Sequence, residues 1–153
     1  MRGLTRAVHL LSRRFRVGLR ADPLAVRQAV PAIARWLVGQ GVSMESAGNV
    51  EIVLTEATNN VIEHACAASP GADLSITCAI TAGCLSVRVR DPGVALPGHM
   101  PPAVPVADLA CPVQDLPEGG FGWLLIAELA ETVRYRRRGG YNLLDLSFRL
   151  RRA

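Results

Sequence analysis

The feature that most constrains the fold of this chain is the spacing of its apolar residues, which changes between the alternation of strands and the spacing of helices. Apolar side chains alternate with polar ones in 14–20, 85–90 and 142–150, the pattern of strands with one buried face. Two further strands, 74–80 and 132–138, complete hairpins with the last two of these. Helical spacing of apolar residues is found instead in 23–37, 43–65 and 119–130. This order predicts an α+β fold: a two-layer α/β sandwich with helices on one face of a mixed, mostly antiparallel sheet.

Local signals mark where the predicted helices begin. Asp22 followed by Pro23 is typical of an N-cap and a first helical position. Ser43, with Ser46 three residues later, predicts the start of the second helix. The Gly139-Gly140 pair predicts a tight turn between the last two strands.

A polar stripe on the second helix is the first candidate for function. Glu56, Asn60 and His64 are spaced four residues apart, so a helix places all three along one side. Taken alone, this stripe is also compatible with an ordinary solvated helix face.

Two later segments add polar or glycine-rich positions at the ends of predicted elements. Asp91 and Gly93 directly follow the strand 85–90, and Gly119, Gly120 and Gly122 begin the helix 119–130. Each segment by itself also fits a simple turn, since Asp-Pro-Gly is a common turn sequence and glycines permit close helix packing. Their order along the chain favours a common site.

These three segments together resemble the GHKL ATPase superfamily, whose fold is called the Bergerat ATP-binding fold. Within it the sequence is most similar to the anti-sigma-factor serine/threonine kinases. Their Glu-x-x-x-Asn-x-x-x-His pattern is matched by Glu56, Asn60 and His64, and their Gly-Gly-x-Gly pattern by Gly119, Gly120 and Gly122. The resemblance extends from about Phe15 to Leu150.

The resemblance implies a role for each matched residue, with ATP and Mg²⁺ as cofactors. Asn60 is expected to bind Mg²⁺ and ATP through its amide oxygen, and Glu56 to act as the general base of phosphoryl transfer. Asp91 is expected to accept the adenine amino hydrogen, with Gly93 beside it. The remaining expected ATP contacts are His64, Gly120 and Gly122, the two glycines presenting N–H groups to phosphates.

Three departures from the family pattern keep alternatives open. Ala95 replaces the last glycine of the Asp-x-Gly-x-Gly box, and no arginine occurs between Val94 and Glu118 to meet phosphate charge. The last hairpin reads Gly-Gly-Tyr-Asn where the family pattern suggests Gly-Thr. ATP binding is therefore expected before kinase turnover, and an ATP-binding interaction module without turnover is the alternative.

The chain length of 153 residues predicts one ATP-binding domain at 13–153, preceded by an extension at 1–12. Six of the ten prolines lie in 94–118, which has no regular period and corresponds to the ATP lid of the family. No secretory signal and no membrane-spanning run is recognised, so a cytoplasmic location is expected.

Arginine supplies the entire positive charge of this protein. All 17 basic residues are arginine, which excludes lysine-dependent chemistry such as Schiff-base catalysis. The predicted strand phases place many of these side chains on one sheet face, which suggests a nucleic-acid surface as a third hypothesis. Few aromatic residues accompany them for base stacking, so nucleic acid is disfavoured.

The family resemblance implies protein partners. These are a sigma factor and an anti-anti-sigma antagonist protein, which the kinase would phosphorylate on Ser or Thr. A homodimer is left open, and no membrane partner is expected.

Overall fold

The computed structural model describes residues 13–103 and 121–153. Within these ranges the chain forms five strands and three α-helices in the order that the sequence predicts. In chain order they are β1 (Arg13–Arg20), α1 (Pro23–Gly39), α2 (Met44–Asn60), β2 (Asp73–Thr81), β3 (Cys84–Asp91), α3 (Phe121–Leu129), β4 (Thr132–Arg138) and β5 (Tyr141–Arg149). Two short turns, η1 (Val61–Ala65) and η2 (Pro97–His99), follow α2 and β3 respectively.

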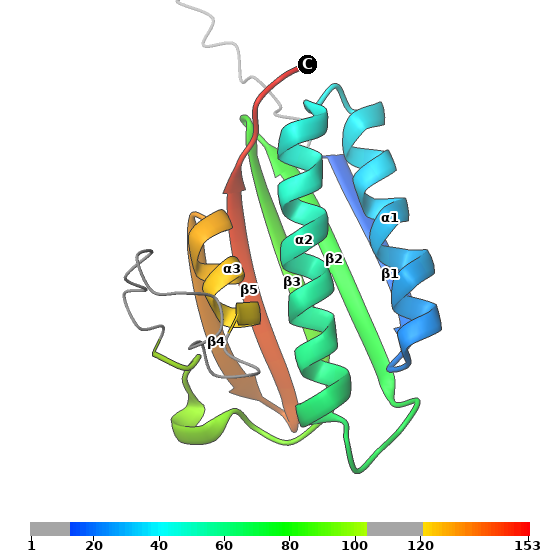
Figure 1. The fold of residues 1–153 in the computed structure, drawn as a ribbon, viewed down its shortest axis with the longest axis vertical. Helices are drawn as coiled ribbons and strands as arrows, with labels where there is room; N and C mark the ends of the chain where they lie inside the picture. The colour runs from blue at the N-terminus through cyan, green and yellow to red at the C-terminus, as the bar shows by residue number, and fades with distance from the viewer. Residues whose placement is uncertain (1–12, 104–120) are drawn as a thin grey trace, which may run out of the picture.

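The strands form one sheet with the order β1-β2-β3-β5-β4, and every neighbouring pair is antiparallel. All three helices lie on one face of it, with α2 in the middle between α1 and α3 (Figure 1). The predicted α+β sandwich with helices on one face is confirmed. None of the described helices has the length and apolar character needed to cross a bilayer.

The core fills the space between this helical layer and the inner side of the sheet. Alternate residues of each central strand point inward, as the burial of Leu85, Val87 and Val89 on β3 illustrates. From α2, the apolar stripe that includes Leu54 and Ala57 packs onto them. No described helix covers the other side of the sheet (Figure 1), and most outward strand positions there are polar.

The predicted starts of both long helices are confirmed by their capping contacts. The Asp22 carboxylate accepts hydrogen bonds from the backbone N–H groups of Leu24 and Ala25, each at 3.0 Å. The Ser43 hydroxyl accepts one from the Ser46 N–H at 3.2 Å. The caps fix where each helix starts and therefore which side chains of α2 face the sheet.

The predicted helix 43–65 departs from regular geometry in its last turn. There the chain widens into the π-turn η1, and the Cys66 N–H donates to the Val61 carbonyl at 2.7 Å. The carbonyl of Ala65 then accepts a hydrogen bond from the Val94 N–H at 2.8 Å. The end of α2 is thus joined to the segment that follows β3.

Candidate functional site

A pocket of about 410 Å³ opens where the end of α2 meets β3, β5 and the segment after β3. It contains three of the predicted site residues, Asn60, His64 and Asp91. Apolar side chains, among them Trp123 from α3 and Tyr135 from β4, form most of its remaining wall. A mainly apolar pocket with a few convergent polar groups is the usual form of a small-molecule site. The sequence analysis did not assign Trp123 or Tyr135 to the site.

Asn60 is the last residue of α2 and lies at the wall of this pocket. Its Nδ2 atom is buried and has no hydrogen-bond partner among the described residues. Leaving a buried amide unpaired costs roughly 1–3 kcal/mol, so an unpaired amide beside a pocket indicates a polar ligand. This is the position at which the sequence analysis expected phosphate and Mg²⁺.

Asp91 lines the same pocket from the end of β3, and the residue is 4% exposed. Its Oδ1 atom accepts hydrogen bonds from the Gly93 N–H and the Asn142 Nδ2, both at 2.9 Å. No described residue donates to Oδ2. Burial raises the pKa of Asp91. The two hydrogen bonds and the charge of Arg137 partly offset this rise. One carboxylate oxygen is thus fixed by the protein, and the other is free to accept a hydrogen bond from a ligand.

Asn142 is the residue that sequence reasoning missed in this site. It pairs with Asp91 across the β3–β5 ladder and is 4% exposed. Besides its bond to Asp91, its Nδ2 donates to the Val94 carbonyl at 2.8 Å. The signal was present in the sequence, because Asn142 is a polar residue in the same strand phase as the buried Leu144 and Leu146.

Two side chains from β4 complete the hydrogen bonds of Asn142. The Tyr135 hydroxyl donates to its Oδ1 at 2.6 Å and accepts from the Leu96 N–H at 3.1 Å. Arg137 Nη1 donates to the same Oδ1 at 2.6 Å and to the Gly93 carbonyl at 2.9 Å. The amide is therefore fully used within the protein. Asn142 orients Asp91 and anchors the start of the predicted lid, and it has no spare group for a ligand.

Glu56 lies one helical turn before Asn60, outside the residues that line this pocket. Its carboxylate is close to the first turn of α3: a Cβ atom added at Gly122 would lie 2.8 Å from Glu56 Oε2 and 3.8 Å from Asn60 Oδ1. The positive end of a helix stabilises a nearby carboxylate. Gly122 thus brings the start of α3 against both polar residues of α2.

The remaining predicted residues have different outcomes. His64 lines the pocket from η1 with an exposed side chain. Gly93 has a structural reason to be glycine, because a Cβ atom there would clash with the Ala65 carbonyl, and its expected contact with ATP stays a prediction. Gly120 and Gly119 lie outside the described residues, as does most of the predicted lid.

A buried thiol lies beneath the base of the pocket. Cys66 Sγ is 4.0 Å from Asp91 Oδ1, and burial together with the negative charge of Asp91 raises its thiol pKa. A thiol in this state is a poor nucleophile, so we assign it to packing.

The residues present fit a nucleotide with a hydrogen-bonding base at one end and phosphates at the other. The free Asp91 oxygen suits a base amino group, and the unpaired Asn60 amide suits a phosphate with its cation. Among the described residues, no three His, Cys, Asp or Glu side chains gather as a metal site. A divalent cation would therefore need phosphate oxygens as further ligands.

Comparisons with known proteins identify the family of the chain. Residues 19–148 match the protein family described as histidine kinase-like ATPase domain. No curated protein sequence matches the chain.

Solved structures show the same fold at low sequence identity. The structure of the RsbU and RsbW domains of Rv1364c from Mycobacterium tuberculosis is 17% identical over 92% of this chain, with a TM-score of 0.65. This chain spans 33% of the length of that protein. The SiaB-SiaC complex from Pseudomonas aeruginosa is 15% identical, covers 88% of this chain and 87% of its own, and has a TM-score of 0.61.

A third structure, the blue-light activated histidine kinase EL346 from Erythrobacter litoralis, is 18% identical over 79% of this chain and 40% of its own, with a TM-score of 0.52. At such identities these three structures support the fold alone. The family match covers most of the chain and implies ATP binding, which confirms the resemblance to GHKL ATPases. This chain belongs to the histidine kinase-like ATPase domain family.

Proposed function

We propose that this protein is an ATP-dependent regulatory kinase of the anti-sigma type, which phosphorylates a Ser or Thr of an antagonist protein and sequesters a sigma factor. The observation that carries the proposal is the pairing of Glu56 and Asn60 on one side of α2, against the start of α3. Fold similarity to the RsbU and RsbW domain structure and to the SiaB-SiaC complex supports a protein partner.

Asn60 and Asp91 would hold the nucleotide from opposite ends of the pocket. Asp91 Oδ2 accepts the amino hydrogen of adenine, which guanine lacks at the equivalent position. The amide of Asn60 meets the phosphates and, through Oδ1, a Mg²⁺ ion. Both side chains keep the hydrogen-bonding capacity for this within the described structure.

Glu56 would serve as the general base. Bound ATP supplies the phosphoryl group that is transferred. The Glu56 carboxylate would accept the proton of the incoming Ser or Thr hydroxyl as the oxygen of that hydroxyl takes the γ-phosphoryl group from ATP, with ADP as the leaving group. A shallow hollow on α2, lined by Gly48, Ile52 and Thr55 among others, includes Glu56 and would give a protein substrate a route to it.

The alternative is an ATP-binding interaction module that transfers no phosphoryl group. The position of Glu56 outside the pocket lining favours it. The absence of arginine from 94–118 in the sequence favours it too, because lid arginines often stabilise transferring phosphates. Both functions need the same ATP site, so only a measurement of phosphoryl transfer distinguishes them.

Nucleotide binding tests what the two functions share. We expect a fluorescent ATP analogue to bind with Mg²⁺ and Asn60→Ala to abolish that binding, whereas the matched variant Asn59→Ala keeps it. Asn60→Ala should retain the thermal stability of the wild type, because the Asn60 Nδ2 makes no hydrogen bond to a described residue. Unchanged affinity in Asn60→Ala would remove the site assignment.

Transfer of label from γ-³²P-ATP to purified antagonist proteins of partner-switching systems tests the kinase. Glu56→Gln should bind ATP normally and transfer at least ~100-fold more slowly, as expected for loss of a general base. Glu128→Gln removes an exposed carboxylate of α3 that lines neither the pocket nor the hollow beside Glu56, so it is the matched control and should transfer normally. Binding without transfer in the wild type would establish the alternative.

A further inference from the structure

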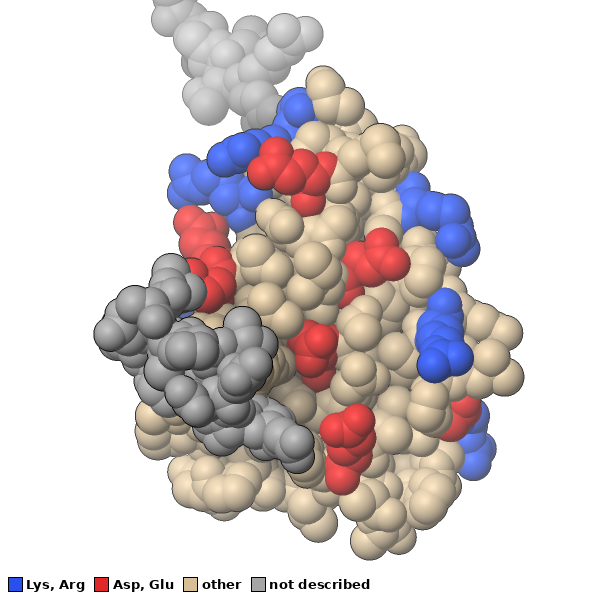
Figure 2. Space-filling model, viewed as in Figure 1, with Lys and Arg blue, Asp and Glu red and all other residues tan. Residues whose placement is uncertain are grey.

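The sheet face opposite the helices carries an excess of arginine. Nine arginines occupy strand positions in the outward phase: Arg14, Arg16, Arg20, Arg88, Arg90, Arg134, Arg136, Arg138 and Arg149. The outward positions of the five described strands include only two carboxylates, Asp73 of β2 and Asp145 of β5. The helical face of the molecule has a different charge pattern: acidic side chains follow one another along α2 (Figure 2).

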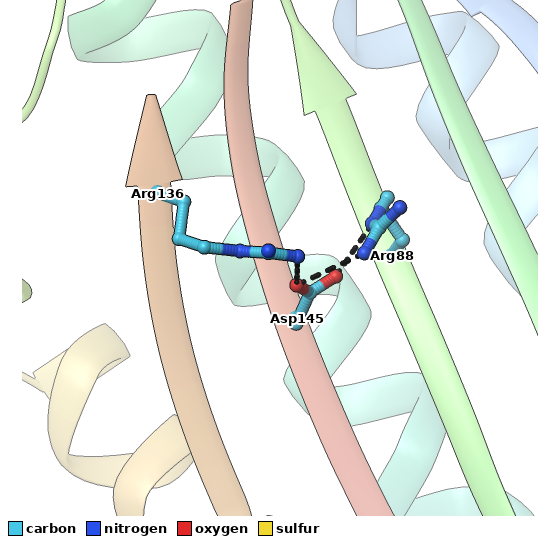
Figure 3. A network of polar contacts seen from close by, with 3 residues as sticks. All are labelled: Arg88, Arg136 and Asp145. Carbon is cyan, nitrogen blue, oxygen red and sulfur yellow. Dashed lines mark hydrogen bonds and ion pairs between the residues drawn. The ribbon is translucent and has the colours of Figure 1, made fainter. Parts of the chain in front are cut away.

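Asp145 shows how this face binds a carboxylate. Its side chain lies between Arg88 of β3 and Arg136 of β4 (Figure 3). Arg88 donates through Nε at 2.6 Å and through Nη2 at 3.1 Å, and Arg136 Nη2 donates at 2.7 Å. Among the described residues, no carboxylate is paired with Arg14, Arg16 or Arg134.

A row of small side chains crosses four strands beside these arginines. The strand registers join Ala79 to Ser86, Ser86 to Ser147, and Ser147 to Thr132. We call this row of Ala79, Ser86, Ser147 and Thr132 the trough. Together with residues of the next row, it lines a shallow hollow of about 440 Å³.

Arginine positions flank the trough on two sides in the strand register. Arg14 of β1 is the cross-strand neighbour of Ala79 and follows it at one end of the row. The adjacent row contains Arg16, Arg88 and Arg134 and runs parallel to the trough. An extended anionic segment lying across the strands would find hydroxyl groups below it and guanidinium groups along one edge.

We propose that the trough is a docking site for an acidic segment of a partner protein, bound through its carboxylates by Arg14, Arg16 and Arg134. The forked contact of Arg88 with Asp145 is an example of the same recognition within the protein. The site lies on the opposite side of the sheet from the nucleotide pocket. A partner could therefore bind there while nucleotide occupies the pocket.

Charge and composition favour this occupant over two others. A second copy of the same face would bring like charges together. A single-stranded nucleic acid would use exposed aromatic rings for base stacking, and the outward Tyr141 ring is covered by the Arg90 guanidinium at 3.3 Å.

A short fluorescein-labelled peptide of alternating Glu and Ser is the probe, and its binding is measured by fluorescence anisotropy. The double variant Arg16→Gln/Arg134→Gln should bind it about fivefold or more weakly. The matched variant Arg27→Gln/Arg35→Gln removes two exposed arginines of α1 and should bind as the wild type does. ATP-analogue binding by each variant verifies that it is folded.

Filling the trough separates a shaped site from diffuse attraction. Ala79→Trp leaves the charge unchanged and places a large ring on the trough floor, so peptide affinity should again fall several-fold. Full peptide affinity in Ala79→Trp, or an equal loss in both arginine double variants, would overturn the proposal in favour of diffuse charge. Tighter binding of a single-stranded oligonucleotide of equal charge would overturn it in favour of a nucleic-acid surface.

Discussion

Two aspartates on neighbouring central strands have opposite environments. Asp91 of β3 points toward the helices, is 4% exposed and receives neutral N–H donors. Asp145 of β5 points to the open face, has a side chain 26% exposed and is paired with two arginines. Burial raises the pKa of Asp91. Burial also acts to raise the pKa of Asp145, but its hydrogen bonds with Arg88 and Arg136 outweigh that and lower it.

The difference shows which carboxylate is prepared for a ligand. The Asp145 carboxylate is paired with Arg88 and Arg136, so its negative charge is already balanced within the protein. Asp91 keeps one oxygen without a described partner, in a pocket, at the cost of burying a charged group. We therefore propose that Asp91 recognises the base and that Asp145 has a structural role on the sheet.

The largest effect on stability is expected at Asn142, which supports Asp91. Asn142→Leu removes an amide that joins Asp91, Val94, Tyr135 and Arg137, and it leaves several of these groups unpaired. The free energy of unfolding should fall by roughly 2–4 kcal/mol. Denaturant titration measures it, with Ser147→Ala on the outer phase of β5 as a control of small effect. A loss below about 1 kcal/mol would show that water replaces the network.

Asp91→Asn should separate binding from stability. The Asn oxygen can still accept from the Gly93 N–H and Asn142, but an NH₂ group replaces the free acceptor. Affinity for ATP should fall roughly 10- to 100-fold, as expected for one hydrogen bond to a charged group. Asp145→Asn is the matched control and should bind ATP normally, and equal losses in both variants would erase the contrast between the two aspartates.

The pH dependence of stability should distinguish the same two variants. The raised pKa of Asp91 means that the folded state holds its proton more tightly, so the stability from this group falls as pH rises through the folded pKa. Asp91→Asn should therefore become more stable relative to wild type as pH increases. Thermal unfolding between acidic and neutral pH measures the difference, and a constant difference would contradict the burial argument.

The smallest effect is expected for Asp145→Asn. Its lowered pKa means that its contribution is present above the unfolded pKa and is lost as pH falls through the folded pKa. Because the Arg88 and Arg136 side chains are largely exposed, the loss at neutral pH should be below about 1 kcal/mol. It should shrink further in high salt. A larger, salt-independent loss would indicate a structural role beyond the ion pairs.

Much of the fold followed from local patterns. Alternation along 85–90 and 142–150, and the caps at Asp22 and Ser43, need only near neighbours in sequence to be interpreted. In β4, Arg134, Arg136 and Arg138 share the outward phase, whereas Tyr135 and Arg137 both contact Asn142 on the helical side of the sheet. The π-turn η1 was not predicted, and the carbonyl of its last residue, Ala65, accepts a hydrogen bond from Val94, which is far away in the sequence.

The candidate site was only partly predictable for the same reason. Helical spacing put Glu56 and Asn60 on one side of α2 without any tertiary information. The pairing of Asp91 with Asn142 depends on the register of β3 with β5, which local patterns do not specify. The Gly-Gly-Tyr-Asn hairpin departs from the family pattern, and its last residue, Asn142, is the one that orients Asp91.

Competition between ATP and GTP for the wild type and Asp91→Asn, with Mg²⁺ present, tests the central claim most directly. The structure predicts that the wild type binds ATP at least about tenfold more tightly than GTP, because Asp91 accepts from an amino group and would repel a carbonyl. Asp91→Asn should lose this preference. Equal affinities of the wild type for ATP and GTP, or no binding of either, would contradict the assignment of this pocket as an ATP site read by Asp91.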